Sequence, residues 1–129
     1  KKEIKKIIFS VGVDSLASVS GALSGDLDPA KGMYWAWQSG YINMKIEGKS
    51  SSCKTRKNQF QFHLGGYLKP YKALRTIVLK PNNYDNINVA VDLANFFSEV
   101  PLSQTNSVMI PGKRAMQLAD RSVKMFAIE

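Results

Sequence analysis

One histidine in a strand-like segment is the chain's main candidate for binding a metal ion. The 129 residues contain one His and one Cys, which excludes sites built from several histidines or several cysteines. His63 lies in residues 59–64, where polar and apolar side chains alternate, so it shares a strand face with Gln59 and Gln61. Neutral imidazole is a good copper ligand, but one ligand does not complete a site. The alternative is a partly exposed polar residue without a metal, and the pattern alone favours it.

Aromatic side chains crowd the segment before the histidine. Tyr34, Trp35, Trp37 and Tyr41 occupy four of eight consecutive positions. In an extended chain Trp35, Trp37 and Tyr41 would share one face, which favours a core strand in which at least one Trp is an aromatic anchor. The functional interpretation is an oxidisable cluster, in which closely spaced Trp and Tyr rings relay or store an electron hole.

Two further groups of polar residues invite a chemical interpretation. Asp26 and Asp28 could bind a hard cation, but the additional oxygen ligands and glycine spacing of a calcium loop are missing. We interpret them as turn and capping residues. Cys53 lies in the Ser-rich basic segment 48–58, where neighbouring cations would favour its thiolate, but simple exposure is the interpretation we prefer.

Enzyme motifs are missing from the sequence. It contains no Gly-x-Ser-x-Gly, no His-Glu-x-x-His and no phosphate-binding glycine loop, and with one histidine we expect no catalytic triad. We therefore expect a protein that is not an enzyme.

Secondary-structure patterns predict one mainly β domain, an antiparallel β-sandwich with a C-terminal helix. Ala115, Leu118, Ala119, Ser122 and Met125 follow helical spacing after Pro111, which predicts a helix over 112–126. Residues 14–33 should form a long loop and 92–97 one capped turn. Strands are predicted at 8–13, 41–47, 59–64, 74–80 and 88–93, with a hairpin joining the second and third and a turn at 81–83 after the fourth.

Composition narrows the class of protein further. Hydrophobic residues make up 44%, which is too many for a disordered chain, and no apolar run reaches the roughly 20 residues of a membrane span. The net charge of +8 comes mainly from residues 45–80, where nine positive side chains face only Glu47. Because the aromatic residues lie outside the basic segment 48–58, that segment is interpreted as an exposed hairpin tip, and we expect no nucleic-acid binding.

Motifs spread over nearly the whole chain resemble those of MbnP-like copper-binding proteins. The most specific is the run Gly-Met-x-Trp-x-Trp-x-x-Gly-Tyr at residues 32–41. Supporting segments, in the same order and spacing, are 11–15 (VGVDS), 20–22 (SGA), 26–29 (DLDP), 45–48 (KIEG), 62–66 (FHLGG), 91–93 (VDL), 109–112 (MIPG) and 125–127 (MFA).

The resemblance implies an exported β-sandwich protein, periplasmic or attached to the cell surface, that binds copper. It implies a partner of the MauG type, a di-haem protein that can oxidise a Trp of the copper protein to kynurenine. Carried over by position, His63 is the copper ligand and either Trp35 or Trp37 is the modified residue. An imidazole and the aniline nitrogen of kynurenine are plausible copper donors. Supporting candidates around the site are Tyr34, Tyr41, Asp26 and Asp28.

The resemblance also has two departures and leaves an alternative function open. Family members carry further strands before the Val-Gly-Val-Asp-Ser segment, so residues 1–129 are expected to be a single MbnP-like domain lacking its N-terminal strands. Some relatives have His where Tyr34 stands, and a second ligand could belong to either place. The alternative function is a module that binds a protein or a glycan through its aromatic cluster, without metal.

Overall fold

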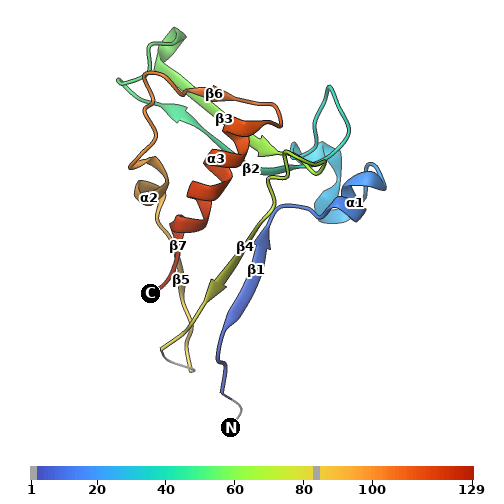
Figure 1. Cartoon of the computed structure of the whole chain (residues 1–129), viewed down its shortest axis with the longest axis vertical. Helices are drawn as coiled ribbons and strands as arrows, with labels where there is room; N and C mark the ends of the chain where they lie inside the picture. Colours follow the sequence, from blue (N-terminus) through green and yellow to red (C-terminus); the bar gives the residue numbers. More distant parts are fainter. Residues whose placement is uncertain (1–2, 83–84) are drawn as a thin grey trace.

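The strands form three small sheets in the part of the chain that the structure describes, residues 3–82 and 85–129 (Figure 1). The structure is a computed structural model. The predicted turn at 81–83 lies partly outside the described residues. One sheet has the order β2 (Ile42–Lys49), β3 (Gln59–Gly65), β6 (Ser107–Val108). The other two are the pairs β1 (Ile7–Val11) with β4 (Arg75–Leu79) and β5 (Val89–Val91) with β7 (Phe126–Ile128).

The predicted hairpin around the basic segment is confirmed. β2 and β3 pair antiparallel, with Lys45 opposite His63 and a register shift between Ile42 and Met44. The alternation of side chains holds in β3, where Phe60, Phe62 and Leu64 are buried. β6 pairs parallel to β3, which departs from the all-antiparallel expectation. Strand β6 has only two residues, too few to show a period in the sequence.

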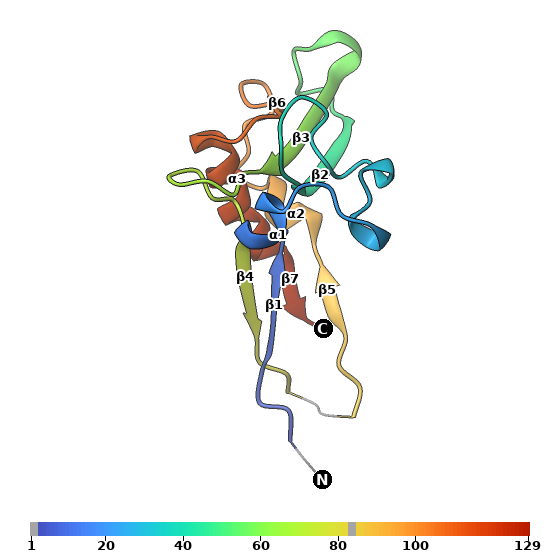
Figure 2. The same cartoon turned by 90° about the vertical axis from the view of Figure 1, so that its right-hand side faces the viewer.

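The two-stranded pairs extend away from the larger sheet towards the N-terminus, and both views show them side by side (Figures 1 and 2). They contact each other through Phe9 of β1 and Phe126 of β7, whose ring centroids lie 5.2 Å apart in an edge-on arrangement. The class predicted from the sequence, mainly β with a C-terminal helix, is confirmed. The sandwich arrangement stays a prediction.

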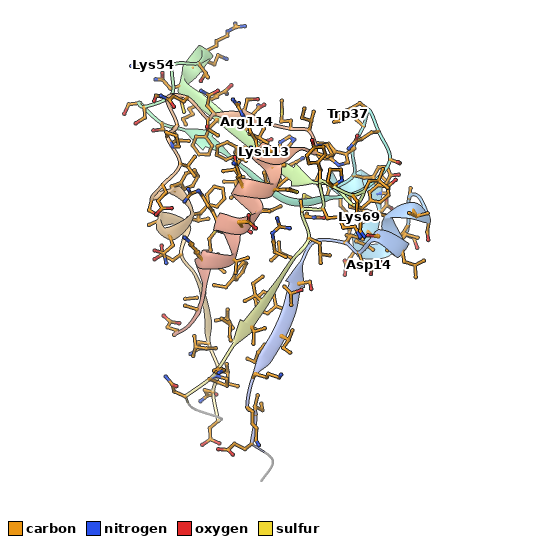
Figure 3. The ribbon with its side chains drawn as sticks, in the orientation of Figure 1. Asp14, Trp37, Lys54, Lys69, Lys113 and Arg114 are labelled. Carbon is orange, nitrogen blue, oxygen red and sulfur yellow. The ribbon has the colours of Figure 1, made fainter. Side chains whose placement is uncertain are left out.

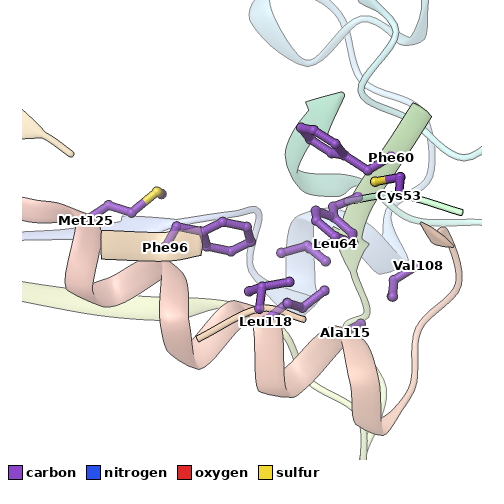
Figure 4. Packing of buried hydrophobic residues seen from close by; sticks show 10 residues of the cluster. Cys53, Phe60, Leu64, Phe96, Val108, Ala115, Leu118 and Met125 are labelled. Carbon is purple, nitrogen blue, oxygen red and sulfur yellow. The ribbon is translucent and has the colours of Figure 1, made fainter. Parts of the chain in front are cut away.

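The hydrophobic core lies between β3 and the C-terminal helix α3 (Lys113–Ser122) (Figure 4). All five residues of the predicted apolar stripe, Ala115 to Met125, are buried. The predicted helix is too long at its C-terminal end: it stops at Ser122, followed by a 3-10 turn, Val123–Met125, and then by β7. Residues 126–128 pair with β5, and a helix that continued through them would lose these strand contacts.

Phe96 reaches the same core from α2 (Leu93–Phe97), where it is fully buried. The predicted capped turn is this helix. The carboxylate of Asp92 accepts a hydrogen bond of 2.9 Å from the backbone N–H of Ala94 and so caps the first turn.

Residues 14–33 differ from the long irregular loop that the sequence predicted. They contain α1 (Ser15–Val19) and two 3-10 turns, η1 (Gly25–Leu27) and η2 (Pro29–Lys31). Asp14 caps α1 by accepting from the N–H of Ala17 at 2.8 Å. Asp28 caps η2 in the same way. Elements of three to five residues are too short to show an apolar period in the sequence.

Cys53 is buried, with 1% of its surface exposed, and it belongs to the core cluster (Figure 4). The expectation of an exposed thiol is therefore wrong. Its neighbours Ser52 and Lys54 are exposed, whereas the side chain of Cys53 points into the core near Phe60 and Val108.

No helix among the described residues is long and apolar enough to cross a membrane.

Candidate functional site

His63 stands on the outer face of β3, as the alternation predicted. Its strand neighbours Phe62 and Leu64 point into the core, and the imidazole itself is 16% exposed. A side chain in that position is sheltered by the sheet and still reachable from solvent. Such partial burial suits a ligand that must exchange a metal ion with the surroundings.

Glu47 of β2 holds the imidazole in place. It lies diagonally across the ladder from His63, and its Oε1 is 2.5 Å from the imidazole Nε2. A carboxylate only accepts hydrogen bonds, so the ring donates through Nε2, and in the neutral tautomer that fits this bond the lone pair is on Nδ1. Histidines that bind metals characteristically donate their other ring N–H to a carboxylate in this way.

Glu47 was not among the site residues predicted from the sequence. The alternation along β2 puts Lys45 and Glu47 on one face of the strand. The register then shows that this is the face of His63. The register depends on the length of the turn and on the shift near Ile42, and neither could be read from the alternation alone.

Trp35 packs over the same face of β3. A Cβ added to Gly65 would lie 3.0 Å from Cζ2 and 3.2 Å from Nε1 of Trp35, and 2.7 Å from the backbone oxygen of Tyr41. Gly65 is two residues after His63 on the strand, so the imidazole and the indole lie over adjacent same-face positions, about 7 Å apart along the strand. The missing side chain of Gly65 is what lets the indole lie against the sheet.

The two tryptophans differ sharply in exposure. Trp35 is 4% exposed and Trp37 is 58% exposed, yet their ring centroids are 5.4 Å apart with an interplanar angle of 56°. The segment is not the continuous strand that was expected. Tyr34 and Tyr41 form a single bridge, residues 36–40 bend between them, and the N–H of Trp35 bonds the carbonyl oxygen of Gly40 at 3.1 Å. A core anchor was predicted for at least one of the two tryptophans, and Trp35 is that anchor.

Tyr41 anchors the loop in front of the aromatic cluster. It is 3% exposed, its hydroxyl donates to the carbonyl oxygen of Leu27 at 2.7 Å, and it accepts from the N–H of Leu23 at 2.9 Å. The ring of Tyr34 meets it edge-on at 4.9 Å. Both tyrosines therefore have structural contacts that hold the aromatic loop.

Asp26 and Asp28 line a cavity of about 230 Å³ together with Tyr41 and Met33. Asp28 accepts a hydrogen bond from the N–H of Ala30 at 2.9 Å, which confirms its predicted capping role. Asp26 pairs with Lys31 at 2.8 Å. Each carboxylate is thus engaged by a neighbour in its own loop.

Within residues 3–82 and 85–129, no group of three or more His, Cys, Asp and Glu side chains is placed to hold a metal ion. The ordinary donors that the structure brings together on the outer face are His63 and Glu47. Since Glu47 occupies Nε2, the unmodified chain offers a metal the Nδ1 atom of one imidazole. A stable copper site needs at least one more donor beside it.

Comparison with known proteins agrees with the sequence motifs. Neither the curated proteins nor the solved structures give a match to this chain. The model of the MbnP family matches residues 1–110, which include the aromatic loop, both hairpin strands and the glycines after His63. The chain therefore belongs to the MbnP family.

Proposed function

We propose that this chain is a copper-binding protein of the cell envelope, periplasmic or attached to the surface, with no catalytic turnover of its own. Its family membership points to a copper-associated role. The observation that carries the proposal is the placing of the Trp35 indole over Gly65, at the next outward-facing position of the strand after His63. The metal ligands would be the Nδ1 atom of His63 and a nitrogen derived from Trp35.

The residues present fit copper only after Trp35 is converted to kynurenine. The aniline nitrogen of kynurenine is the former indole Nε1, and in the structure Nε1 lies 3.2 Å from the position that a Gly65 Cβ would take. The change would therefore create a donor on the face that already carries His63. Imidazole and amine nitrogens are donors that copper accepts. Trp37 is more than half exposed and has no such place against the strand.

The conversion needs an oxidant, which we propose is a MauG-type di-haem protein using hydrogen peroxide. Trp and two waters give N-formylkynurenine, four protons and four electrons, as the C2–C3 bond of the indole breaks and two carbonyl groups form. Two hydrogen peroxide molecules take up those electrons and protons and become four waters. A further water then hydrolyses the formyl group and releases formate.

Electrostatics of the hairpin support the role of the histidine. Glu47 supplies a negative charge beside the imidazole, and outer partners of this kind fix the orientation of the ligand. When bound, copper would add a redox-active cation to this face. His63, held by Glu47, and the nitrogen derived from Trp35 would supply the ligands on this face.

Expression with and without the di-haem partner tests the proposal. We expect the matured wild type to gain the mass of one oxygen and lose that of one carbon, with the change located at Trp35 by peptide mapping. Copper titration should then show uptake by the wild type and by Gln61→Ala, a matched control on the same strand face, and not by His63→Ala. Unmodified tryptophans together with equal copper uptake in all three proteins would rule the proposal out.

A second candidate function is a module that binds a protein or a glycan without metal. The exposed ring of Trp37 favours it, since aromatic side chains at a surface commonly contact partners. Metal analysis of protein purified from its native envelope separates the two functions. Stoichiometric copper supports the first candidate, and its absence from protein with unmodified Trp35 supports the second.

A further inference from the structure

An apolar recess of about 340 Å³ opens beside the loop that carries Trp37. Three separate segments build its walls: Gln38 and Ser39, residues 66–71, and Pro111 just before α3. Its lining includes the side chains of Tyr67, Leu68 and Tyr71. None of these residues has a role in the copper site described above.

The recess is structurally continuous with the tryptophan cluster. Gly40 lies between the two, because a Cβ there would meet Tyr67 Cε1 at 2.8 Å and Trp35 Cδ1 at 3.8 Å. The hydroxyl groups of Ser39 and Tyr67 are hydrogen-bonded at 3.0 Å. The loop that carries Trp37 is therefore attached to one wall of the recess, which holds the loop in place relative to the recess.

Large apolar side chains surround this recess and remain exposed. Leu68 is 64% exposed, Ile110 next to Pro111 is 62% exposed, and Tyr71 is also exposed. Like Trp37, they are large exposed apolar groups on segments that form the recess or adjoin it. Patches of this kind are characteristic of surfaces that bind another protein.

Positive side chains flank the same surface. Lys69 lines the recess, and Lys113 is exposed just after Pro111 (Figure 3). Lys72 is exposed at the end of the segment that carries Tyr71. The segments 38–40, 66–72 and 110–114 contain no acidic residue. One exposed carboxylate, that of Asp14, lies beside this border, because the neighbouring Ser15 donates a hydrogen bond to the carbonyl oxygen of Tyr67. A partner that covers the recess would therefore meet a border with more positive than negative side chains, and these charges favour an acidic partner.

We propose that this recess is the docking surface for the acidic face of the di-haem protein that oxidises Trp35, with Trp37 as the ring through which electrons leave. The inference rests on the proposed function. Trp35 is nearly buried and offers a partner almost no contact of its own. A protein bound over the recess would touch the loop that carries Trp37. The ring centroids of Trp37 and Trp35 are 5.4 Å apart. Because electron transfer slows steeply with distance, electrons from Trp35 would leave by way of Trp37.

The docking surface is tested by binding of the purified MauG-type di-haem protein to Lys69→Glu and Leu68→Ser. Each has a matched control on a distant element, Lys57→Glu on the hairpin tip and Leu93→Ser on α2. We expect the recess variants to bind at least about tenfold more weakly and the controls to bind as the wild type does, with affinity falling as salt is raised. Equal binding by all variants, or equal weakening by the controls, would overturn the docking surface.

The path of the electrons is tested with peroxide-driven mass gain at Trp35. With the partner at a concentration that saturates binding, we expect Trp37→Phe to gain mass at Trp35 at least about tenfold more slowly than the wild type. Trp37→Tyr, which keeps an oxidisable ring, should recover part of the rate. Modification of Trp37→Phe at the wild-type rate would overturn the relay.

The two proposals fail in different ways. A wild type that binds the di-haem protein through the recess without gaining mass would leave the docking surface standing and would overturn the copper proposal. A Lys69→Glu variant that gains mass as fast as the wild type would overturn the docking surface and leave the copper proposal standing.

Discussion

Glu47 and His63 lie diagonally across the β2–β3 ladder, with the carboxylate Oε1 2.5 Å from the imidazole Nε2. The pair depends on a hairpin register that opposes Lys45 to His63. Its consequence is a histidine whose second nitrogen keeps its lone pair, beside an indole that lies over Gly65. Five predictions follow from this arrangement and from the core behind it.

Replacing Glu47 with Gln removes the negative charge and keeps a side chain of nearly the same shape. We expect the matured protein to bind copper about ten- to hundredfold more weakly, the usual loss when an outer partner of a metal-binding histidine is changed. Glu3→Gln, an exposed residue with the same change of charge, is the control. Competition titration against a copper chelator measures the affinities, and equal values for both variants would remove Glu47 from the site.

Gly65→Ala should disturb the aromatic seat. The new methyl would lie 2.7 Å from the Tyr41 backbone oxygen and 3.0 Å from the Trp35 ring, so one of them must move. We expect a loss of about 1–3 kcal/mol in the free energy of unfolding and a shift in Trp fluorescence. Gly112→Ala is the matched control because open space surrounds it. Urea unfolding that gave both variants the wild-type stability would contradict the close approach.

Phe62 is fully buried between β3 and the helices, and its ring meets Phe96 edge-on at a centroid distance of 6.0 Å. Phe62→Ala should lower the free energy of unfolding by about 3–5 kcal/mol, through lost burial and the cavity left behind. Leu16→Ala, at a position 80% exposed, should change it by less than about 0.5 kcal/mol. Denaturant melts of the two variants make the comparison.

Cys53 should be protected from thiol reagents in the native protein. Its side chain is 1% exposed, so labelling requires the hairpin tip to open. We expect slow labelling in buffer and rapid labelling once urea unfolds the chain. Cys53→Ser combined with Ser52→Cys moves the thiol to an exposed neighbour and should be labelled at once. Rapid labelling of the native wild type would contradict the burial.

Glu99 and Arg121 form an ion pair on the outer side of α3. The hydrogen bond from Arg121, with the charges of Arg121 and Lys124, holds the pKa of the Glu99 carboxyl below its ordinary value. Because the folded pKa is lowered, the pair stabilises the fold above the unfolded pKa of about 4.3 and stops doing so as pH falls through the folded pKa. NMR titration should show a higher Glu99 pKa in Arg121→Gln than in the wild type. The effect on stability should be small, since both groups meet solvent.

The sequence by itself determined the features that repeat with a period or belong to a local motif. Alternation identified the hairpin strands and the outward face of His63, and helical spacing identified every buried residue of α3. The side-chain caps Asp28 and Asp92 were readable because a cap acts within a few residues. The aromatic motif and the segments around it indicated the family.

Only the tertiary structure decided how distant residues meet. Glu47 reaches His63 because a particular register pairs two strands, and alternation is compatible with more than one register. The difference between Trp35 and Trp37 arises because residues 36–40 bend and Gly65 leaves room for one indole, contacts between residues 30 positions apart. The burial of Cys53 in a polar segment has the same origin, since burial depends on what packs against a side chain and a local sequence pattern does not record that.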